Sequence, residues 1–324
     1  MKPRLRQGIP VALTSALFLG LSPILGKLAI NLGLPPLIVV AGRTVGAALL
    51  LLAALLILNR KLLYIHPLGL AGCGLAGLLN GVGSLFYYLA LGRIEAALGQ
   101  LLFSFYPLFV AGLLYLDGFR YSRLTLVRLL MILPAALLMT SPAMANGDWV
   151  GMAMMLVAGL LYALHIPVNQ RVLYESPAPT VTFYTLLAMA LVVVPVAAVF
   201  KGPLEAADSG SLLALAGLTM VTFFSRLTLF SGVKSIGGLD TAVIGLGELV
   251  VTLFFAHLWL GERLAIAQWA GAAVLTISIG LVLLDRRPKS RRPLGGWLGW
   301  LMPPTSTVSE MPPPLAKPGA SGEE

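Results

Sequence analysis

Two ionisable residues of opposite charge lie inside long apolar runs of the sequence. Arg226 falls in the run 211–233, and Glu248 falls in the run 240–260. A charged side chain inside a membrane-spanning helix costs about 2.5–3.5 kcal/mol to insert, so each one needs a compensating contact or a functional role. Both residues are eleven positions from Gly237, at the centre of the connector, so an antiparallel helical hairpin places them at nearly equal depth. The pair is expected either to join two helices or to bind a substrate or a proton.

Three further titratable side chains lie within apolar runs. Lys27 and Arg43 flank the connector 32–35, so both are expected in the same half of the membrane. Lys27 has two interpretations, a stem that reaches the membrane surface or a cavity ligand, and Arg43 has either a structural or a cavity role. His165 is a candidate proton relay, with a hydrogen-bonded structural histidine as the alternative. Glu248 is the second candidate for proton coupling.

Aromatic and amide side chains near the middle of the runs are candidate walls for a binding cavity. Tyr106 is the first choice, because an offset of 142 residues places it over Glu248. An aromatic residue in a span more often faces lipid or a neighbouring helix, which is the alternative for each. The side chains selected as substrate ligands are Tyr106, Glu248, Arg226, Arg43, Asn80, Tyr87, Tyr184 and Lys27. Three of these are cations and one is an anion, which favours a substrate that carries a carboxylate.

The residue patterns of several other chemistries are missing from this sequence. Cys73 is the sole cysteine, and the three histidines are far apart without metal-binding spacing, so neither a disulfide nor a metal site is expected. There is no phosphate-binding GxxxxGK[ST] loop and no visible nucleophile–base set. We therefore expect no catalytic residues, no cofactor and no enzymatic activity.

The composition is that of a membrane protein. Of 324 residues, 58% are hydrophobic and 11% are charged, whereas soluble domains carry about 25% charged residues. The net charge of +9 lies mainly in short connectors and in the segment 286–292, as membrane topology rules predict. Nucleic-acid binding is therefore not expected.

Apolar runs between breaker residues predict ten transmembrane helices, since about 20 residues cross the hydrocarbon layer. The predicted spans are 9–31, 36–58, 67–91, 97–116, 124–141, 149–171, 180–200, 211–233, 240–260 and 264–284. The first is interpreted as a permanent span rather than a cleaved signal peptide. With the N-terminus inside, sixteen Lys and Arg residues lie on the inner side and three on the outer side. This bias predicts a multi-pass inner-membrane protein with both termini cytoplasmic.

The chain is predicted to contain a duplicated unit. The segments that begin at Leu91 and Val233 align at an offset of 142, and Pro23 with Lys27 falls over Pro167 with Arg171 at an offset of 144. The predicted regions are a first repeat 1–145, a second repeat 146–285 and a disordered, basic and proline-rich tail 286–324. Because each repeat holds five spans, the second copy must be inverted in the membrane.

These residues resemble the EamA-type permeases of the drug/metabolite transporter superfamily over the chain as far as about residue 285. The resemblance rests on Lys27, on Arg43 and on the endings Leu246-Gly247-Glu248-Leu249, Leu260-Gly261-Glu262-Arg263-Leu264 and Gln268-Trp269-Ala270-Gly271. The sequence departs from that family at Phe119-Arg120, where Gly-Glu is usual, and at Leu249, where proline is usual. The resemblance implies an all-α membrane fold of ten helices and a permease or exporter of amino acids or similar metabolites.

The expected mechanism is secondary transport by alternating access around a cavity at mid-depth between the inverted repeats. A flippase for a lipid or a lipid-linked sugar is the main alternative; a membrane-embedded enzyme and a channel are less favoured. The expected partners are a small-molecule substrate, membrane lipids and, as an option, a second copy of the chain in a homodimer.

Overall fold

The computed structural model describes residues 3–119, 121–132, 134, 148–200, 208–261, 265–281 and 296–301, and every regular element in these ranges is a helix. The helices are α1 (Pro3–Asn31), α2 (Pro36–Leu58), α3 (Pro67–Leu91), α4 (Ala96–Phe103), α5 (Tyr106–Leu116), α6 (Arg123–Leu130), α8 (Trp149–Leu173), α9 (Ala178–Phe200), α10 (Ser209–Ile236), α11 (Gly238–Gly245), α12 (Gly247–Trp259) and α13 (Ile266–Gly280). Two short 3-10 helices, η1 (Arg60–Leu63) and η4 (Gly299–Leu301), complete the described chain.

Eight helical segments within the described residues are long and apolar enough to cross a membrane. Six are continuous helices, and the other two are the pairs α4–α5 and α11–α12, each counted as one segment. The remaining helices, α6 and α13, stand at the fifth and tenth predicted spans. Parts of those two spans, including residues 135–141 and 282–284, lie outside the described residues.

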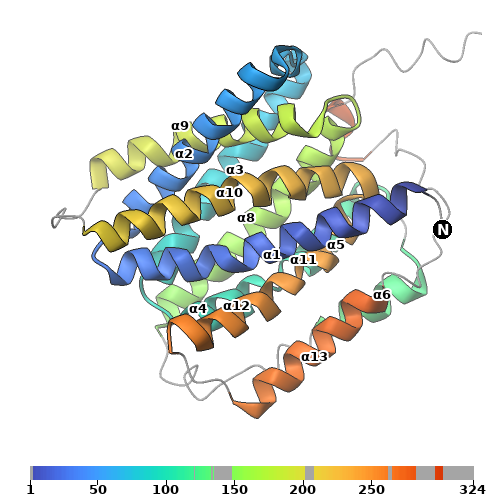
Figure 1. Ribbon diagram of the computed structural model, residues 1–324. Helices are drawn as coiled ribbons and strands as arrows, with labels where there is room; N and C mark the ends of the chain where they lie inside the picture. The colour runs from blue at the N-terminus through green and yellow to red at the C-terminus, as the bar shows by residue number, and fades with distance from the viewer. Residues whose placement is uncertain are drawn as a thin grey trace, which may run out of the picture.

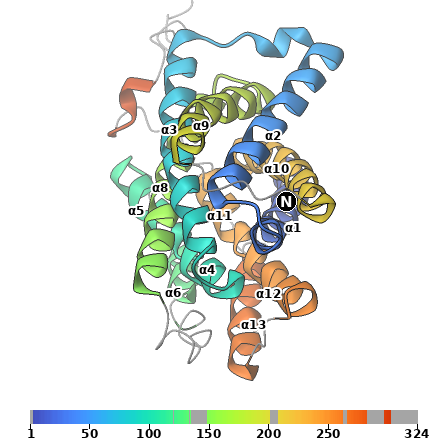
Figure 2. The same cartoon turned by 90° about the vertical axis from the view of Figure 1, so that its left-hand side faces the viewer.

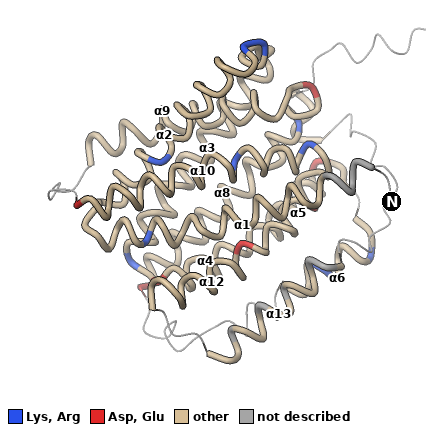
Figure 3. The backbone as a smooth tube through the Cα atoms, in the orientation of Figure 1, with Lys and Arg blue, Asp and Glu red and all other residues tan. Residues whose placement is uncertain are grey.

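The outside of the bundle is suited to lipid rather than to water. Large apolar side chains such as Ile57, Leu58 and Ile266 are more than 80% exposed. Figure 3 shows long stretches of helix without charge, and charged residues mainly near helix ends. Such a surface would be a liability in water, because large exposed apolar patches cause association, and it is the normal surface of a membrane protein.

The two repeats interlock through their first and third helices. Helix α1 lies along α10, and α3 lies along α8, as Figures 1 and 2 show from two sides. A Cβ atom on Gly20 would lie 2.6 Å from the Glu248 carbonyl oxygen of α12, so glycine permits this close approach. The Thr252 hydroxyl of α12 donates to the Gly20 carbonyl at 2.8 Å. Helix α12 is thereby held against α1.

A face of small residues on α3 packs against α9. The sequence places Gly69, Cys73, Gly77 and Gly81 at intervals of four, which predicts close helix packing. In the structure, a Cβ atom on Gly77 would lie 2.6 Å from the Thr185 carbonyl oxygen. Gly81 faces Val192 in the same way. The small-residue face therefore sets the α3–α9 distance.

Two spans are broken at equivalent positions, which sequence analysis did not predict. Helix α4 ends at Phe103 and α11 ends at Gly245, and these positions differ by the repeat offset of 142. Pro107 follows the first break, where its ring is tolerated in the first turn of α5. The second break has no proline; Leu246 there is flanked by Gly245 and Gly247. Both breaks lie in the interior of the bundle.

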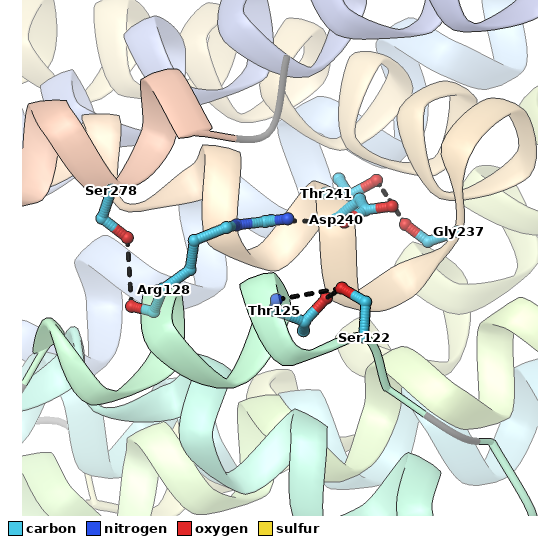
Figure 4. A network of polar contacts seen from close by, with 7 residues as sticks. All are labelled: Ser122, Thr125, Arg128, Gly237, Asp240, Thr241 and Ser278. Carbon is cyan, nitrogen blue, oxygen red and sulfur yellow. Dashed lines mark hydrogen bonds and ion pairs between the residues drawn. The ribbon is translucent and has the colours of Figure 1, made fainter. Parts of the chain in front are cut away.

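A partly buried ion pair links α6 of the first repeat to α11 of the second. Arg128 is fully buried, and its Nη2 lies 3.3 Å from Oδ1 of Asp240. Figure 4 shows this side chain reaching across to Asp240, while Ser278 of α13 donates to the Arg128 carbonyl at 3.1 Å. Ser122 caps α6 by accepting from the Thr125 N–H. The contact fixes the start of α11, and hence the approach to its break.

Candidate functional site

The bundle has two ends, which we call the turn end and the N-terminal end. The turn end holds the α1–α2 connector, residues 32–35, together with the start of α4 and the start of α8. The N-terminal end holds the start of α1, the ends of α5 and α8, and the connection from α10 to α11. Gly237 makes that connection with a φ of 95°, a conformation that favours glycine.

A small cavity of about 50 Å³ lies between the two repeats. Helices α1, α2, α3 and α4 of the first repeat and α8, α10 and α12 of the second repeat contribute to its walls. The lining residues are Leu19, Ser22, Arg43, Asn80, Gly83, Ser84, Tyr87, Tyr88, Gln100, Phe103, Ala158, Tyr162, Arg226 and Glu248. Ser22, Arg43 and Gln100 lie within ten residues of the turn end of their helices. The cavity therefore lies nearer the turn end.

Arg43 of α2 crosses the cavity and contacts both of its facing helices. Its Nη2 donates to the Ser84 hydroxyl of α3 at 3.2 Å, and its Nη1 reaches the Thr222 hydroxyl of α10 at 3.5 Å. The guanidinium also lies 4.6 Å from the centroid of the Tyr88 ring, a cation–π distance. With only 5% of its surface exposed, Arg43 is a buried cation without an acidic ion-pair partner among the described residues.

Arg226 and Glu248 line the same cavity, as their equal depth predicts. They form no direct ion pair among the described contacts. Arg226 instead reaches the Asn80 amide oxygen at 3.5 Å and lies over the Tyr162 ring at 5.5 Å. Glu248 is 2% exposed and lies in the same cavity wall as Gln100 and Arg226. Opposite charges thus face one cavity without neutralising each other by contact.

Unpaired polar atoms concentrate around this cavity. Nine buried side-chain atoms of the described residues have no hydrogen-bond partner, and six of them belong to lining residues. The six are Arg43 Nε, Tyr88 Oη, Gln100 Nε2, Tyr162 Oη, Arg226 Nη1 and Glu248 Oε1. Buried polar groups are normally satisfied, because an unmade bond costs about 1–3 kcal/mol. Such a gathering is typical of a site that receives a polar ligand or ordered water.

Tyr106 lies beneath the cavity rather than in its wall. Its ring packs against two lining residues, Phe103 at 5.4 Å and Tyr162 at 5.0 Å between centroids. Its hydroxyl donates to the Ala242 carbonyl at 3.0 Å. The aromatic contacts continue from Tyr162 through His165 to Phe230. These rings close the cavity toward the N-terminal end.

His165 belongs to that aromatic layer. Its side chain is fully buried, and its Nδ1 forms a hydrogen bond with the Tyr162 carbonyl of the same helix. Its Nε2 has no partner among the described residues. The ring lies outside the cavity wall, separated from it by Tyr162. Its role as a proton relay stays a prediction.

Two residues selected from the sequence as substrate ligands lie elsewhere. The Tyr184 hydroxyl donates to the Leu63 carbonyl at 2.6 Å, at the N-terminal end. The Lys27 ammonium donates to the Leu91 and Ile94 carbonyls at 2.7 and 2.9 Å, where it caps the end of α3. Both polar groups bind backbone, and the structure brings neither residue into the cavity wall. Asn80, Tyr87, Arg43, Arg226 and Glu248 are the selected residues that the structure brings into the cavity wall.

Sequence analysis missed three hydroxyl groups at this site. Ser22 and Ser84 line the cavity, and Thr222 bonds Arg43. The signal was available on α3, where Asn80 and Ser84 are four positions apart and so share a helix face. At the repeat offset of 142 these two positions correspond to Thr222 and Arg226 on α10.

Comparison with known proteins agrees with this architecture. The model of the EamA-like transporter family matches the chain twice, over residues 6–141 and 149–284. The chain belongs to the EamA-like transporter family. Two copies of the family unit explain the matched breaks in α4–α5 and α11–α12, and they identify a multi-pass membrane protein of the drug/metabolite transporter superfamily.

Two relatives of this EamA-like transporter illustrate the range of similarity. The protein named Uncharacterized transporter YcbK, of Bacillus subtilis (strain 168), is 22% identical over 218 residues, which cover 61% of this chain and 67% of the relative. A crystal structure described only as that of a protein shares 18% identity, with a TM-score of 0.69. The match covers 88% of this chain and 99% of that one, and it shows a common fold.

Some predicted parts of the EamA-like transporter lie outside the described residues. Glu262 and Arg263 of the Gly-Glu-Arg ending are among them, as is most of the predicted tail 286–324. Residues 296–301 of that tail are described and are ordered against the bundle. The family assignment makes the chain a transporter; its cargo is a separate question.

Proposed function

We propose that this transporter carries a small zwitterionic metabolite of the amino-acid type by alternating access. The observation behind the proposal is the cavity in which Arg43 and Arg226 face Glu248 without ion pairing. A carboxylate fits between guanidinium donors, and an ammonium group fits Glu248. The Tyr87 and Phe103 rings supply apolar wall for a side chain.

The closed aromatic layer supports alternating access. Tyr106, Tyr162 and Phe230 seal the cavity toward the N-terminal end, while the cavity itself lies nearer the turn end. Inverted repeats allow the opposite arrangement by a rocking of one repeat against the other. By the distribution of basic residues, the N-terminal end faces the cytoplasm of a bacterial-type inner membrane, and both termini lie there.

The charge requirement is tested by uptake into proteoliposomes. The matched solutes are an amino acid, its decarboxylated amine and its deaminated acid. We expect the amino acid to be carried and each analogue to be carried at least about tenfold more slowly, because each leaves one buried charge unmatched. Equal transport of all three solutes would refute the zwitterion assignment.

Two variants test the recognition of the carboxylate and of the ammonium group of the substrate separately. Arg226→Gln is expected to remove most discrimination against the amine, and Glu248→Gln most discrimination against the acid. Tyr184→Phe, distant from the cavity, is the matched control and should leave all three rates unchanged. Lipid scrambling by the purified protein without solute uptake would instead indicate a flippase.

Proton coupling is part of the same proposal. Glu248 in the wall and His165 beneath it are the candidate proton carriers. We expect Glu248→Gln to flatten the pH dependence of uptake, and His165→Asn to do so only if a proton passes through the aromatic layer. An unchanged pH dependence in the double variant would exclude coupling through these residues.

A further inference from the structure

A short segment near the end of the described chain packs onto the N-terminal end of the bundle. Residues 296–301 contain the triplet Gly-Trp-Leu twice in succession. A 3-10 helix has about three residues per turn, so positions three apart share a face. Leu298 and Leu301 are 0% and 4% exposed, whereas Trp297 and Trp300 are 40% and 53% exposed. The repeated triplet thus produces a buried leucine face and an exposed indole face.

The leucine face packs against α3 and α8. Leu298 and Leu301 form a buried cluster with Ala76 of α3 and Val168 of α8. A Cβ atom placed on Gly72 of α3 would lie 3.2 Å from a methyl group of Leu301. Because α3 belongs to the first repeat and α8 to the second, the segment covers a junction between the repeats.

The segment also shares a carboxylate with a buried ion pair. Oδ2 of Asp117, which follows α5, accepts from Arg171 at the end of α8 at 2.8 and 3.0 Å. Both side chains are 1% exposed. The second oxygen, Oδ1, accepts the Leu298 N–H at 3.2 Å. The Trp297 indole donates to the Leu113 carbonyl of α5 at 3.2 Å.

This arrangement makes the ion pair depend on the segment. A buried ion pair is favourable only when further hydrogen bonds satisfy its remaining lone pairs, and the Leu298 N–H does so for Asp117. The pair joins α5 of the first repeat to α8 of the second at the end of the bundle away from the cavity. Separation of the repeats at that end must therefore disturb the Asp117–Arg171 contact.

We propose that residues 296–301 are a latch, and that the latch must leave Asp117 before the cavity can open at the N-terminal end. The inference rests on the proposed alternating access and adds a regulatory element to it. Docked, the segment holds α3, α5 and α8 together and favours the closed form. Released, it exposes a polar carboxylate oxygen and an apolar groove on α3 and α8.

The native cysteine provides a direct test in the full-length protein. Cys73 lies on α3 next to Gly72 and is buried against Val181 of α9, in the second repeat, so its exposure reports separation of the repeats at this end. We compare its rate of labelling by a water-soluble maleimide in wild type, in Leu298→Ser/Leu301→Ser and in the exposed-face control Trp300→Ser. The double variant is expected to label about tenfold faster or more, given the apolar burial it removes, and the control at the wild-type rate. Wild-type labelling in the double variant would overturn the latch.

A cross-link tests the same point by holding the segment in place. In a Cys73→Ser background, Ala76→Cys with Leu298→Cys puts two thiols in the same buried cluster, where a disulfide or a short bifunctional thiol reagent joins them. Uptake should stop in the oxidised protein and return on reduction; full uptake while cross-linked would refute the proposal. If no solute is carried by any variant, the proposed function fails, whereas Cys73 labelling still decides whether the segment controls opening.

Discussion

The Tyr106 hydroxyl donates a hydrogen bond to the Ala242 carbonyl at 3.0 Å, so the break in one repeat is tied to the break in the other. The carbonyl is accessible because the Leu246 N–H bonds to Val243, three residues back, instead of to Ala242. Gly245 leaves room for the hydroxyl, since a Cβ atom there would collide with it. Tyr106 thus uses a carbonyl that a continuous helix would have occupied.

Gly245→Ala is expected to destabilise the protein by about 1–3 kcal/mol through this collision. In a Tyr106→Phe background the cost should be much smaller, because the nearest remaining ring atom lies 3.6 Å away, an ordinary contact. Thermal unfolding of the four proteins, followed by a thiol-reactive dye at buried Cys73, measures the coupling. Additive effects of the two substitutions would argue against the contact.

The α3–α9 interface predicts a contrast between two glycines of the same helix. Gly77→Ala should lower the melting temperature, because its new methyl group would meet the α9 backbone at 2.6 Å. Gly74→Ala is the matched control: no atom lies within 4 Å of its new methyl group, and alanine favours the helix by about 1 kcal/mol. Circular dichroism in detergent gives both melting temperatures. Equal shifts would contradict the described packing.

The Arg128–Asp240 ion pair predicts strong coupling between α6 and α11. Asp240→Asn should destabilise the fold by about 2 kcal/mol, because it removes a carboxylate from a fully buried guanidinium. Arg128→Met combined with Asp240→Leu should cost less than Asp240→Asn alone, since an apolar pair needs no neutralisation. Denaturant-induced unfolding of the variants tests this order. A double variant less stable than the single one would contradict it.

The Arg93–Asp148 contact at the turn end predicts a pH effect. The hydrogen bond from Arg93 and the N–H groups of Gly151 and Val150 hold the pKa of Asp148 below its usual value. The contribution to stability is therefore complete above the unfolded pKa of about 3.9 and is lost as the pH falls through the lower folded value. Melting temperatures from about pH 6 to about pH 3 should decline less steeply in Asp148→Asn. Arg93→Gln retains the backbone N–H donors to Asp148, so its melting temperature should decline with a slope between those of the wild type and Asp148→Asn.

The continuous spans were predictable because composition and breakers act locally. The predicted runs 36–58 and 67–91 coincide with α2 and α3, where proline at the first turn and a polar connector mark the boundaries. The breaks at 103–106 and 246 were not predicted, because the hydropathy of these runs is uninterrupted. Glycine on both sides of Leu246 was the available sign of the second break.

The cavity was predictable only where charge or symmetry marked it. Arg43, Arg226 and Glu248 were recognisable because a buried charge in a span needs a reason. Lys27 carries the same signal but caps α3, since a long flexible stem can reach backbone carbonyls several ångströms from its own helix. Hydroxyl groups such as Ser84 give no signal in hydropathy, and their role depends on which helix they face.

Positions 106 and 248 occupy the same place in two copies of one ancestral segment, yet one now carries a phenol and the other a carboxylate. Duplication supplied matching backbones, and later divergence put one side chain beneath the cavity and the other in its wall. The two positions should therefore tolerate substitution differently. A saturation library selected for stability alone should lose variants changed at position 106. A library selected for transport of the cargo should lose variants changed at position 248. Exchange of the two side chains would satisfy neither selection.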